Sequence, residues 1–430
     1  MFPRTGLWAH ADFMRLWSAQ AISAFGSRIT RTALPIIAVQ SLDESETVVA
    51  LLSSVYLAPG VVLALFAGGI IDRSRKRRIL IASDIFRAAV VASVTVAWLF
   101  GVLAMWHLIV VGALVGAASA LFSIADTAYL PTLVDKRQLG EGNAKLETTE
   151  AVAEVTGPAS AGVLIGALGA PLAVALDAAS YLWSAVWLRR IRAVEAPPVP
   201  TPSAESSTWQ SRRDLRDGMR AIFGHPHVRA VVLALMVWSI AGGFFTALYT
   251  LFCLRTLGLS ELTFGIIIAV GGIGSFAGAL ISRRLVGSLG LGPTMILSAV
   301  ISLAGCLLIP LASGPTVVVL LFLCAHQLIS DCFSVAFVIQ AVTLRQTVLP
   351  KHMLGRANAA VHVCTAGLVP ITALLAGLLA ELTSIRTAVW VGVSIGLLAP
   401  FFLIPLRGLR RMPESHSSTE IVRAASSYDR

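Results

Sequence analysis

Residues 68–78 read GGIIDRSRKRR and lie between two long apolar runs. A short, densely basic loop in such a position is typical of a connection that stays on the cytoplasmic side of a membrane. Asp72 is the single acid among the five cations of this loop, and an acid there can pair with Arg or Lys across a gap between helices. The stretch therefore predicts a membrane protein with a specific ion pair at this loop.

The composition agrees with this interpretation. Of the 430 residues, 56% are hydrophobic and only 13% are charged, whereas a soluble domain usually carries about 25% charged residues. A membrane-spanning helix needs roughly 20 apolar residues, and the sequence offers twelve such runs. They fall near residues 13–40, 48–70, 79–100, 104–130, 145–166, 171–189, 228–254, 262–281, 294–311, 316–343, 358–380 and 386–406. We therefore predict an all-α protein with twelve transmembrane helices.

The positive charge alternates along the predicted connections. Lys and Arg gather in the even-numbered connections and after the last helix, while Arg255 and Arg386 are the main exceptions in the odd-numbered ones. This positive-inside bias predicts a multi-pass protein of the cell (inner or plasma) membrane with both termini in the cytoplasm. The net charge of +10 alone would suggest nucleic acid as a partner, but its distribution argues for the lipid bilayer and against nucleic acid.

The chain also repeats itself. The pattern LGxxNA begins at Leu139 and again at Leu354, an offset of 215 residues (354 minus 139). The same offset relates AG at 161–162 to 376–377 and SE at 45–46 to 260–261. Repeats of about six spans predict two bundles related by an axis along the membrane normal, with a cavity between them at the midplane.

This repeat divides the chain into two bundles and a joint. We predict an N-terminal six-helix bundle over 1–190, a cytoplasmic linker over 191–226, a C-terminal six-helix bundle over 227–411 and a disordered cytoplasmic tail over 412–430. The linker has four prolines between 197 and 202, followed by a basic amphipathic stretch. Such a composition predicts a semi-rigid or disordered segment.

With these features the sequence resembles the major facilitator superfamily. The family's loop motif between helices 2 and 3 runs G-x-x-x-D-[RK]-x-G-[RK]-[RK], and Arg75 replaces its second glycine here. The matching residues are Gly68, Asp72, Arg73, Lys76 and Arg77. The resemblance covers nearly the whole chain and implies the major facilitator fold and a functional monomer.

Other stretches resemble one branch of the superfamily, the drug:proton antiporters. These are YLPTLV at 129–134, GNA at 142–144 and GPASAG at 157–162. The branch includes macrolide-efflux-like pumps, enterobactin-type siderophore exporters and lysophospholipid transporters. Gly157 and Pro158 resemble the antiporter signature of helix 5, with Ala153 and Ala161 in place of some of its glycines. Importers usually lack this signature, so the resemblance implies export; the alternative is ordinary packing of small residues.

The resemblance also implies a gate. In the family, the loop acid and cations close the cytoplasmic side and separate during transport, and Asp126 near the cytoplasmic end of helix 4 could join them. Asp84 and Arg87 lie three residues apart and are expected to pair locally. The alternative is a loop that only sets the topology, beside local ion pairs.

Acids inside apolar runs are the candidates for proton coupling. Glu147, Glu150 and Glu154 share one stripe of helix 5 because their spacings are three and four, and intramembrane acids usually face an aqueous cavity or a partner. We rank Glu154 first, then Glu150, then Glu147. The alternative is a structural pair with Arg28 or Arg31 of helix 1.

The second half offers fewer candidates. Asp331 is the only acid well inside its bundle, with His326 and Gln327 about one turn before it. It is the second coupling candidate. His362 in helix 11 could shuttle protons because histidine titrates near neutral pH, although packing is the more common role for such a residue.

Cations inside the first apolar run point to a polar cavity. An unpaired Arg at the centre of a membrane helix costs about 2.5–3.5 kcal/mol on translocon scales, so Arg28 and Arg31 are expected to neutralise the helix 5 acids or attract an anionic group of a substrate. Snorkelling is the alternative. The predicted cavity residues are Arg28, Arg31, Tyr56, Phe245, Gln327 and Gln340.

No P-loop, nucleophile elbow or HExxH sequence occurs, so neither ATP-driven transport by this chain nor an intramembrane enzyme is favoured. The five cysteines lie in apolar runs without C-x-x-C spacing, and we predict no metal site and no cofactor. The sequence favours an exporter that exchanges a small, lipophilic, drug-like molecule for protons. The alternatives are a dedicated siderophore or metabolite exporter, a lysophospholipid transporter, and a non-transporting receptor or scaffold.

Overall fold

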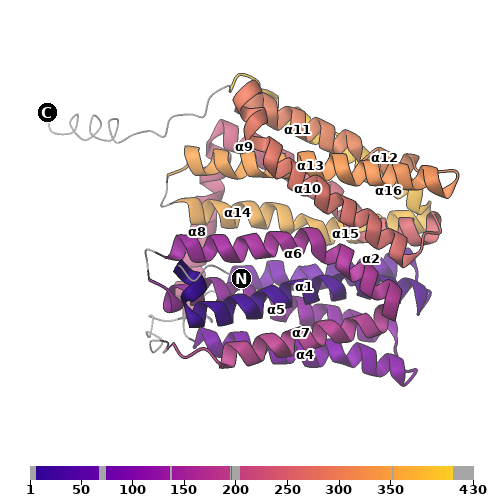
Figure 1. Ribbon diagram of the computed structural model, residues 1–430. Helices are drawn as coiled ribbons and strands as arrows, with labels where there is room; N and C mark the ends of the chain where they lie inside the picture. Colours follow the sequence, from indigo (N-terminus) through magenta and orange to yellow (C-terminus); the bar gives the residue numbers. More distant parts are fainter. Residues whose placement is uncertain are drawn as a thin grey trace.

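The computed structural model describes residues 6–66, 74–135, 138–193, 195, 204–350 and 353–409. Helices run alongside one another in two bundles, the lower and upper parts of Figure 1. The first bundle follows the short η1 (Gly6–Ala9) and comprises α1 (Ala11–Gln40), α2 (Glu46–Phe66), α4 (Lys76–Leu99), α5 (Met105–Leu133), α6 (Leu139–Leu168) and α7 (Ala170–Arg189).

The second bundle has more broken helices. It comprises α9 (Pro226–Leu251) with the π-helical turn η2 (Phe252–Thr256), α10 (Glu261–Leu289), α11 (Leu291–Gly305), α12 (Leu308–Leu311), α13 (Thr316–Val348), α14 (Leu354–Ala366), α15 (Leu368–Leu382), α16 (Ile385–Gly396), α17 (Ala399–Phe402) and η4 (Ile404–Leu406). The repeated LGxxNA pattern opens α6 in the first bundle and α14 in the second.

The chain is a membrane protein by the length and composition of its helices. In the part that the structure describes, nine helical segments are long and apolar enough to cross a bilayer. Helices α1 and α6 have 30 residues each, about 45 Å, but carry charged residues within their length. The prediction of twelve spans therefore rests on nine clear segments together with α1, α2 and α6.

Several helices extend beyond their apolar cores. Helix α6 begins at Leu139 rather than near 145, and α10 ends at Leu289 rather than near 281. The added turns are polar and lie at one end of the molecule, which we call the basic end: it holds the beginnings of α4, α6 and α14 and the end of α7. Hydropathy locates the apolar part of a helix and not its polar turns, so the ranges predicted from the sequence were too short there.

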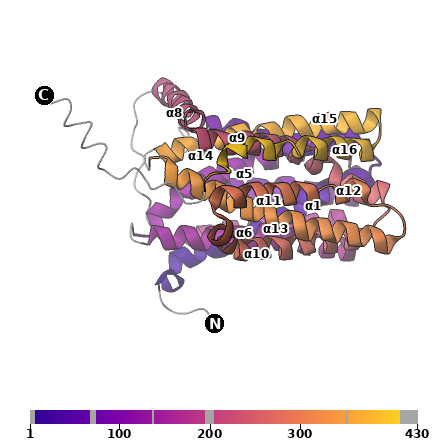
Figure 2. The same ribbon diagram turned by 90° about the horizontal axis from the view of Figure 1, so that it is seen from above.

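Residues 204–224 form helix α8 (Ala204–Gly224), where a semi-rigid or disordered linker was expected. This helix lies at the basic end (Figure 2) and packs against α14. Its Leu215, Met219 and Ile222 share one apolar cluster with Ala357 and Ala360. The amphipathic pattern explains the difference, because an apolar stripe with a partner helix favours an ordered helix.

The two bundles meet most closely at the other end, which we call the closed end. There α6 packs against α10 and α2 packs against α15, and Figure 1 shows α10 slanting from the upper bundle to the far end of α6. A Cβ on Gly162 would lie 2.2 Å from the Gly265 Cα, and one on Gly377 would lie 2.3 Å from the Ala50 Cβ. Glycines allow this approach because only they lack a Cβ.

The apolar core follows the same division. One cluster of buried residues joins both bundles at the closed end, for example Ala161 and Ile165 of α6 with Phe264 and Ile267 of α10. Toward the basic end, the described buried residues form separate clusters in the two bundles. The halves therefore share a core at one end only, and the cavities described below lie between them.

Candidate functional site

The loop motif is only partly within the described residues, since Gly68, Asp72 and Arg73 lie outside them. At the start of α4, the Lys76 backbone N–H donates to Glu195 Oε1 at 2.6 Å. Arg77 Nε donates to the Leu188 carbonyl at 2.9 Å, and its Nη2 donates to the Arg189 carbonyl. Glu195 thus pairs with a backbone N–H at the start of α4, where the helix dipole favours a negative charge. Arg77 pairs with backbone carbonyls at the end of α7, where the dipole favours a positive charge.

Asp126 lies in α5. Its carboxylate accepts a hydrogen bond from the Gln20 side-chain amide of α1, and both residues line a cavity of about 330 Å³ inside the first bundle. The expected local pair of Asp84 and Arg87 is confirmed and is deeply buried. Its guanidinium lies 4.2 Å from the Tyr181 ring centroid. A gating role for any of these residues stays a prediction.

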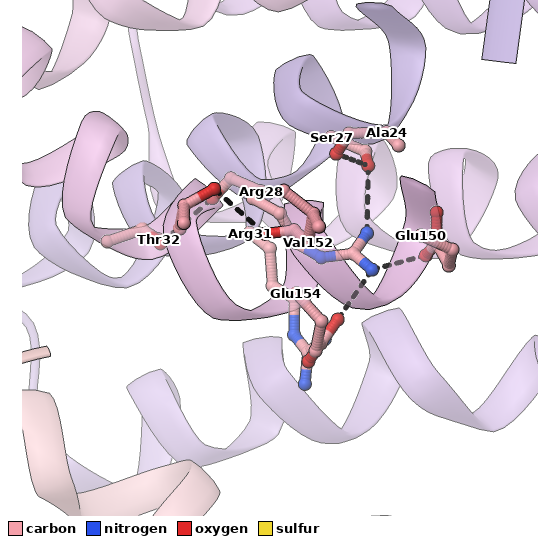
Figure 3. Close-up of polar contacts among 9 residues, drawn as sticks. Ala24, Ser27, Arg28, Arg31, Thr32, Glu150, Val152 and Glu154 are labelled. Atoms are coloured by element: carbon pink, nitrogen blue, oxygen red, sulfur yellow. Dashed lines mark hydrogen bonds and ion pairs between the residues drawn. The ribbon is translucent and has the colours of Figure 1, made fainter. Parts of the chain in front are cut away.

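The strongest charge cluster connects α1 with α6 (Figure 3). The Arg28 guanidinium forms ion pairs with both Glu150 and Glu154, and it donates to Ser27 Oγ at 3.2 Å. Arg31 Nη1 lies 3.5 Å from Glu154 Oε1. The Arg28 side chain is only 12% exposed, whereas those of the two glutamates are more than half exposed. The acids are therefore paired with a buried cation and remain open to the cavity.

The glycine of the helix 5 signature has a direct steric role beside this cluster. A Cβ on Gly157 would lie 2.6 Å from Cγ of Arg28, closer than real Cβ contacts. Gly157 thus provides the space through which the Arg28 side chain reaches Glu150 and Glu154. Helix α6 continues through Pro158, whose side chain lies outside what the structure describes.

A central cavity of about 260 Å³ separates the halves. Its first-bundle wall includes Arg28, Arg31, Glu154 and Tyr56. Its second-bundle wall is apolar and aromatic and is formed by Phe245, Thr246, Tyr249, Thr250, Phe264 and Ile268. Four of the predicted cavity residues, Arg28, Arg31, Tyr56 and Phe245, therefore line one space. The charged wall and the apolar wall suit an amphiphilic guest.

Asp331 lies in a separate cavity of about 260 Å³ within the second bundle, together with His326 and Gln327. The His326 Nδ1 lies 3.2 Å from the Gly305 carbonyl. Gln340 is placed elsewhere: it is buried and donates to Ser282 Oγ at 2.6 Å. His362 lines a further space between the halves, beside Arg31. The structure thus does not bring Asp331 or His362 into the ion-pair cluster.

Two polar anchors lie outside the predicted site residues, and sequence reasoning missed the contact of the second. Asp177 is fully buried and accepts hydrogen bonds from Thr30 of α1 and Ser180 of its own helix. Arg255 of η2 reaches across to the first bundle, 2.9 Å from Asp43 Oδ1 and 3.3 Å from Glu46 Oε1. Arg255 is an exception to the clustering of Lys and Arg in the even-numbered connections, and this exception could have revealed the pairing.

No group of three or more His, Cys, Asp or Glu side chains that could hold a metal ion occurs in the described ranges. Chemically, the arrangement offers exchangeable ion pairs and an enclosed amphiphilic space. Cations, a carboxylate and aromatic rings line this space.

Comparison with known proteins agrees with this architecture. Over 221 residues the chain is 22% identical to macrolide efflux protein A of Streptococcus pyogenes, a match that covers 51% of this chain and 53% of that protein. The chain thus spans about half the length of this curated relative. The solved nucleoside transporter NupG is 12% identical with a TM-score of 0.71, over 92% of this chain and 98% of that one.

A second solved protein was determined in two states. The bacterial homologue of the iron transporter ferroportin, 18% identical, matches with a TM-score of 0.71 in its inward-facing state and 0.59 in its outward-facing state. Both matches cover 92% of this chain, and they cover 98% and 99% of the solved chains. The family model described as Major Facilitator Superfamily matches residues 16–366. The chain therefore belongs to the Major Facilitator Superfamily.

Proposed function

We propose that this protein is a proton-driven exporter that moves a small, lipophilic molecule out of the cell by alternating access. The observation that carries the proposal is the central cavity, which lies between two halves joined at one end only. One wall of this cavity has the Arg28 ion-pair cluster and the other is aromatic. Two bundles that rock about such a site can expose it to each side in turn.

The charge distribution supports an orientation. The basic end carries Arg77, Arg189 and α8, so the positive-inside rule favours placing it in the cytoplasm. In the twelve-span topology both termini then lie there too. The closed end then faces outward, and the cavity is loaded from the cytoplasmic side, as an exporter requires. The higher TM-score to an inward-facing transporter fits this state.

Proton coupling is assigned to the ion pairs of Arg28. Glu150 and Glu154 are exposed enough to meet water from the cavity, and a proton on either acid removes its attraction for the buried guanidinium. The contact between α1 and α6 then weakens, and these helices can move relative to each other. Because α6 also packs against α10 of the second bundle, such a shift bears directly on the interface between halves.

One observation favours a second candidate, an exporter of a siderophore or other partly anionic metabolite. Arg31 is 49% exposed, lines the central cavity and has only the long 3.5 Å contact with Glu154. A cation in that position can receive a carboxylate or phenolate group of a substrate.

The test is transport by membrane vesicles with the basic end outward. Uptake of a lipophilic cation, a macrolide and a siderophore is followed with an imposed proton gradient and after its collapse by an uncoupler. We expect gradient-dependent uptake of at least one of the lipophilic compounds. Uptake that persists unchanged with the uncoupler would contradict proton coupling, and uptake of the siderophore alone would favour the second candidate.

A further inference from the structure

The cavity around Asp331 differs from the first-bundle sites in how its charge is balanced. Asp331 is the only charged side chain that lines it, and no Lys or Arg is present among the lining residues. Within the described part of the chain, neither a hydrogen bond nor an ion pair reaches its carboxylate. Glu150 and Glu154, by contrast, have Arg28 as a partner.

A carboxylate without a partner inside a membrane bundle is costly in its charged form. Two events remove that cost: the carboxylate takes up a proton, or a cation enters the cavity and pairs with it. None of the described residues that line the cavity supplies such a cation. The site is therefore suited to a cation from outside the chain.

The walls of the cavity are suited to the same kind of guest. Trp238, Phe245 and Tyr249 of α9 all line it, and the Trp238 ring is held by stacking on Phe337, with centroids 5.3 Å apart. Aromatic faces attract organic cations, and more strongly when the cation has lost its water. Phe245 and Tyr249 also line the central cavity, so the two spaces adjoin at these rings.

The Asp331 carboxylate packs closely against the backbone of α10. Gly271 faces Asp331, and a Cβ there would lie 2.2 Å from Asp331 Oδ2 and 3.0 Å from Gln327 Nε2. The absence of a side chain at Gly271 therefore leaves room for the Asp331 carboxylate itself, with the Gln327 amide nitrogen beside it. An ammonium group has to approach the carboxylate from the cavity, which the aromatic rings of α9 line.

We propose that this cavity binds the ammonium group of a lipophilic organic cation, with Asp331 as its counter-ion and Trp238, Phe245 and Tyr249 as its walls. A proton and the cation compete for the same carboxylate. The titratable groups that also line the cavity are Tyr249 from α9, Cys306 at the end of α11 and His326 from α13, while α10 contributes Ile268 and no titratable group. The inference rests on the proposed exporter function for its place in transport, but binding is testable without transport.

The experiment measures equilibrium binding to the purified full-length protein in lipid nanodiscs. The probe is tritiated tetraphenylphosphonium, displaced by benzyltrimethylammonium or by neopentylbenzene, its uncharged isostere of nearly equal shape. We expect the ammonium compound to compete about tenfold or more better than the isostere. Probe affinity should fall as the pH is lowered from about 8 to about 5, since a proton then occupies the carboxylate.

Variants assign the effect to this cavity. Asp331→Asn should weaken probe binding about tenfold or more and remove the preference for the charged competitor. Asp331→Glu should retain that preference. Gly271→Ala retains the Asp331 charge, but its new Cβ would displace the carboxylate. This variant should therefore also weaken probe binding. Glu381→Gln is the control, an exposed acid near the end of α15 whose loss should leave the preference for the charged competitor intact.

Three results would overturn the site: equal competition by both isosteres, unchanged binding by Asp331→Asn, or loss of the charge preference in Glu381→Gln. If Asp331→Asn does not give a monodisperse protein, Asp331→Glu and Gly271→Ala decide the question. Failure of the exporter proposal has a different signature. Charge-selective binding that needs Asp331, without gradient-driven uptake in vesicles, contradicts the exporter and leaves the site in place.

Discussion

At the scale of single residues, Arg28 explains why the first bundle contains two acids at membrane depth. Its guanidinium is buried, and a buried cation requires partners in a medium of low polarity. Glu150 and Glu154 supply the charge and Gly157 supplies the space. The signature glycine and the intramembrane acids of α6 therefore belong to one arrangement.

Substitution of Glu154 tests the coupling role. We expect Glu154→Gln to reduce proton-driven efflux about tenfold, within the range of ordinary coupling energies, because one exchangeable ion pair of Arg28 is lost. The measurement is initial uptake by vesicles with and without the proton gradient. Glu381→Gln, at an exposed position near the end of α15, is the control and should transport normally. Wild-type coupling in Glu154→Gln would exclude Glu154 as a proton site.

Gly157 gives a prediction about stability. Gly157→Ala should lower the unfolding free energy by about 1–3 kcal/mol, the usual cost of overpacking, because the new Cβ meets the Arg28 stem while two ion pairs hold its guanidinium. Gly287→Ala is matched to it: Gly287 lies in α10 with nothing within 4 Å of an added Cβ. That variant should be neutral or slightly stabilised. Thermal unfolding in detergent compares the two, and equal midpoints would contradict this account of Gly157.

At the scale of helices, the closed end is held by packing and by one polar contact. The pairs α6–α10 and α2–α15 approach through glycines, while Arg255 of η2 bridges to the loop after α1 and to the start of α2. Asp43 is almost fully exposed, whereas Arg255 and Glu46 are each about a quarter exposed. Screening by water is weaker for the second pair, so Glu46 should contribute more to closure.

Breaking this contact should shift the protein toward opening at the closed end. We expect about 1 kcal/mol from Glu46→Gln or Arg255→Gln, a several-fold change in the population ratio, and less from Asp43→Asn. Spin labels at Glu44 and Thr383, in a background with the five native cysteines replaced, report the separation of the halves. Identical distance distributions in all three variants would rule out a role for Arg255 in closure.

At the scale of the whole molecule, the two halves share an architecture but divide the charges unequally. The offset of 215 that relates the repeats takes Glu154 to Val369 and Arg31 to Thr246. Among the described residues that line the cavities, the first bundle thus has paired charges, and the second has the Asp331 carboxylate and aromatic rings. A substrate in the central cavity would meet a polar surface on one side and an apolar surface on the other.

The state of the whole molecule can be tested by labelling. Thr246 lines the central cavity and is exposed, so Thr246→Cys should react with a membrane-impermeant maleimide mainly from the basic end. Ser313→Cys, in the exposed segment between α12 and α13, should react from the other side. The comparison uses vesicles of both orientations. Faster reaction of Thr246→Cys from the same side as Ser313→Cys would contradict an inward-open resting state.

Much of the fold could be predicted from the sequence because its causes are local. Span length and apolarity decide which segments enter a membrane. The two copies of the repeated pattern begin at Leu139 and Leu354, and these are the first residues of α6 and α14. The family resemblance is confirmed over residues 16–366. Polar helix turns and the amphipathic α8 were missed because their helical state depends on partners such as α14.

The pairing of charges was decided only by the tertiary structure. The sequence by itself determined that Arg28, Glu150, Glu154 and Asp331 lie within helices of a membrane protein. It left open whether the acids face arginine or stand alone, because Arg28 and Glu150 are separated by 122 residues. The rotation and depth of distant helices bring Arg28 between two glutamates and leave Asp331 among aromatic rings. Those rotations follow from how whole helix faces pack, which no single segment encodes.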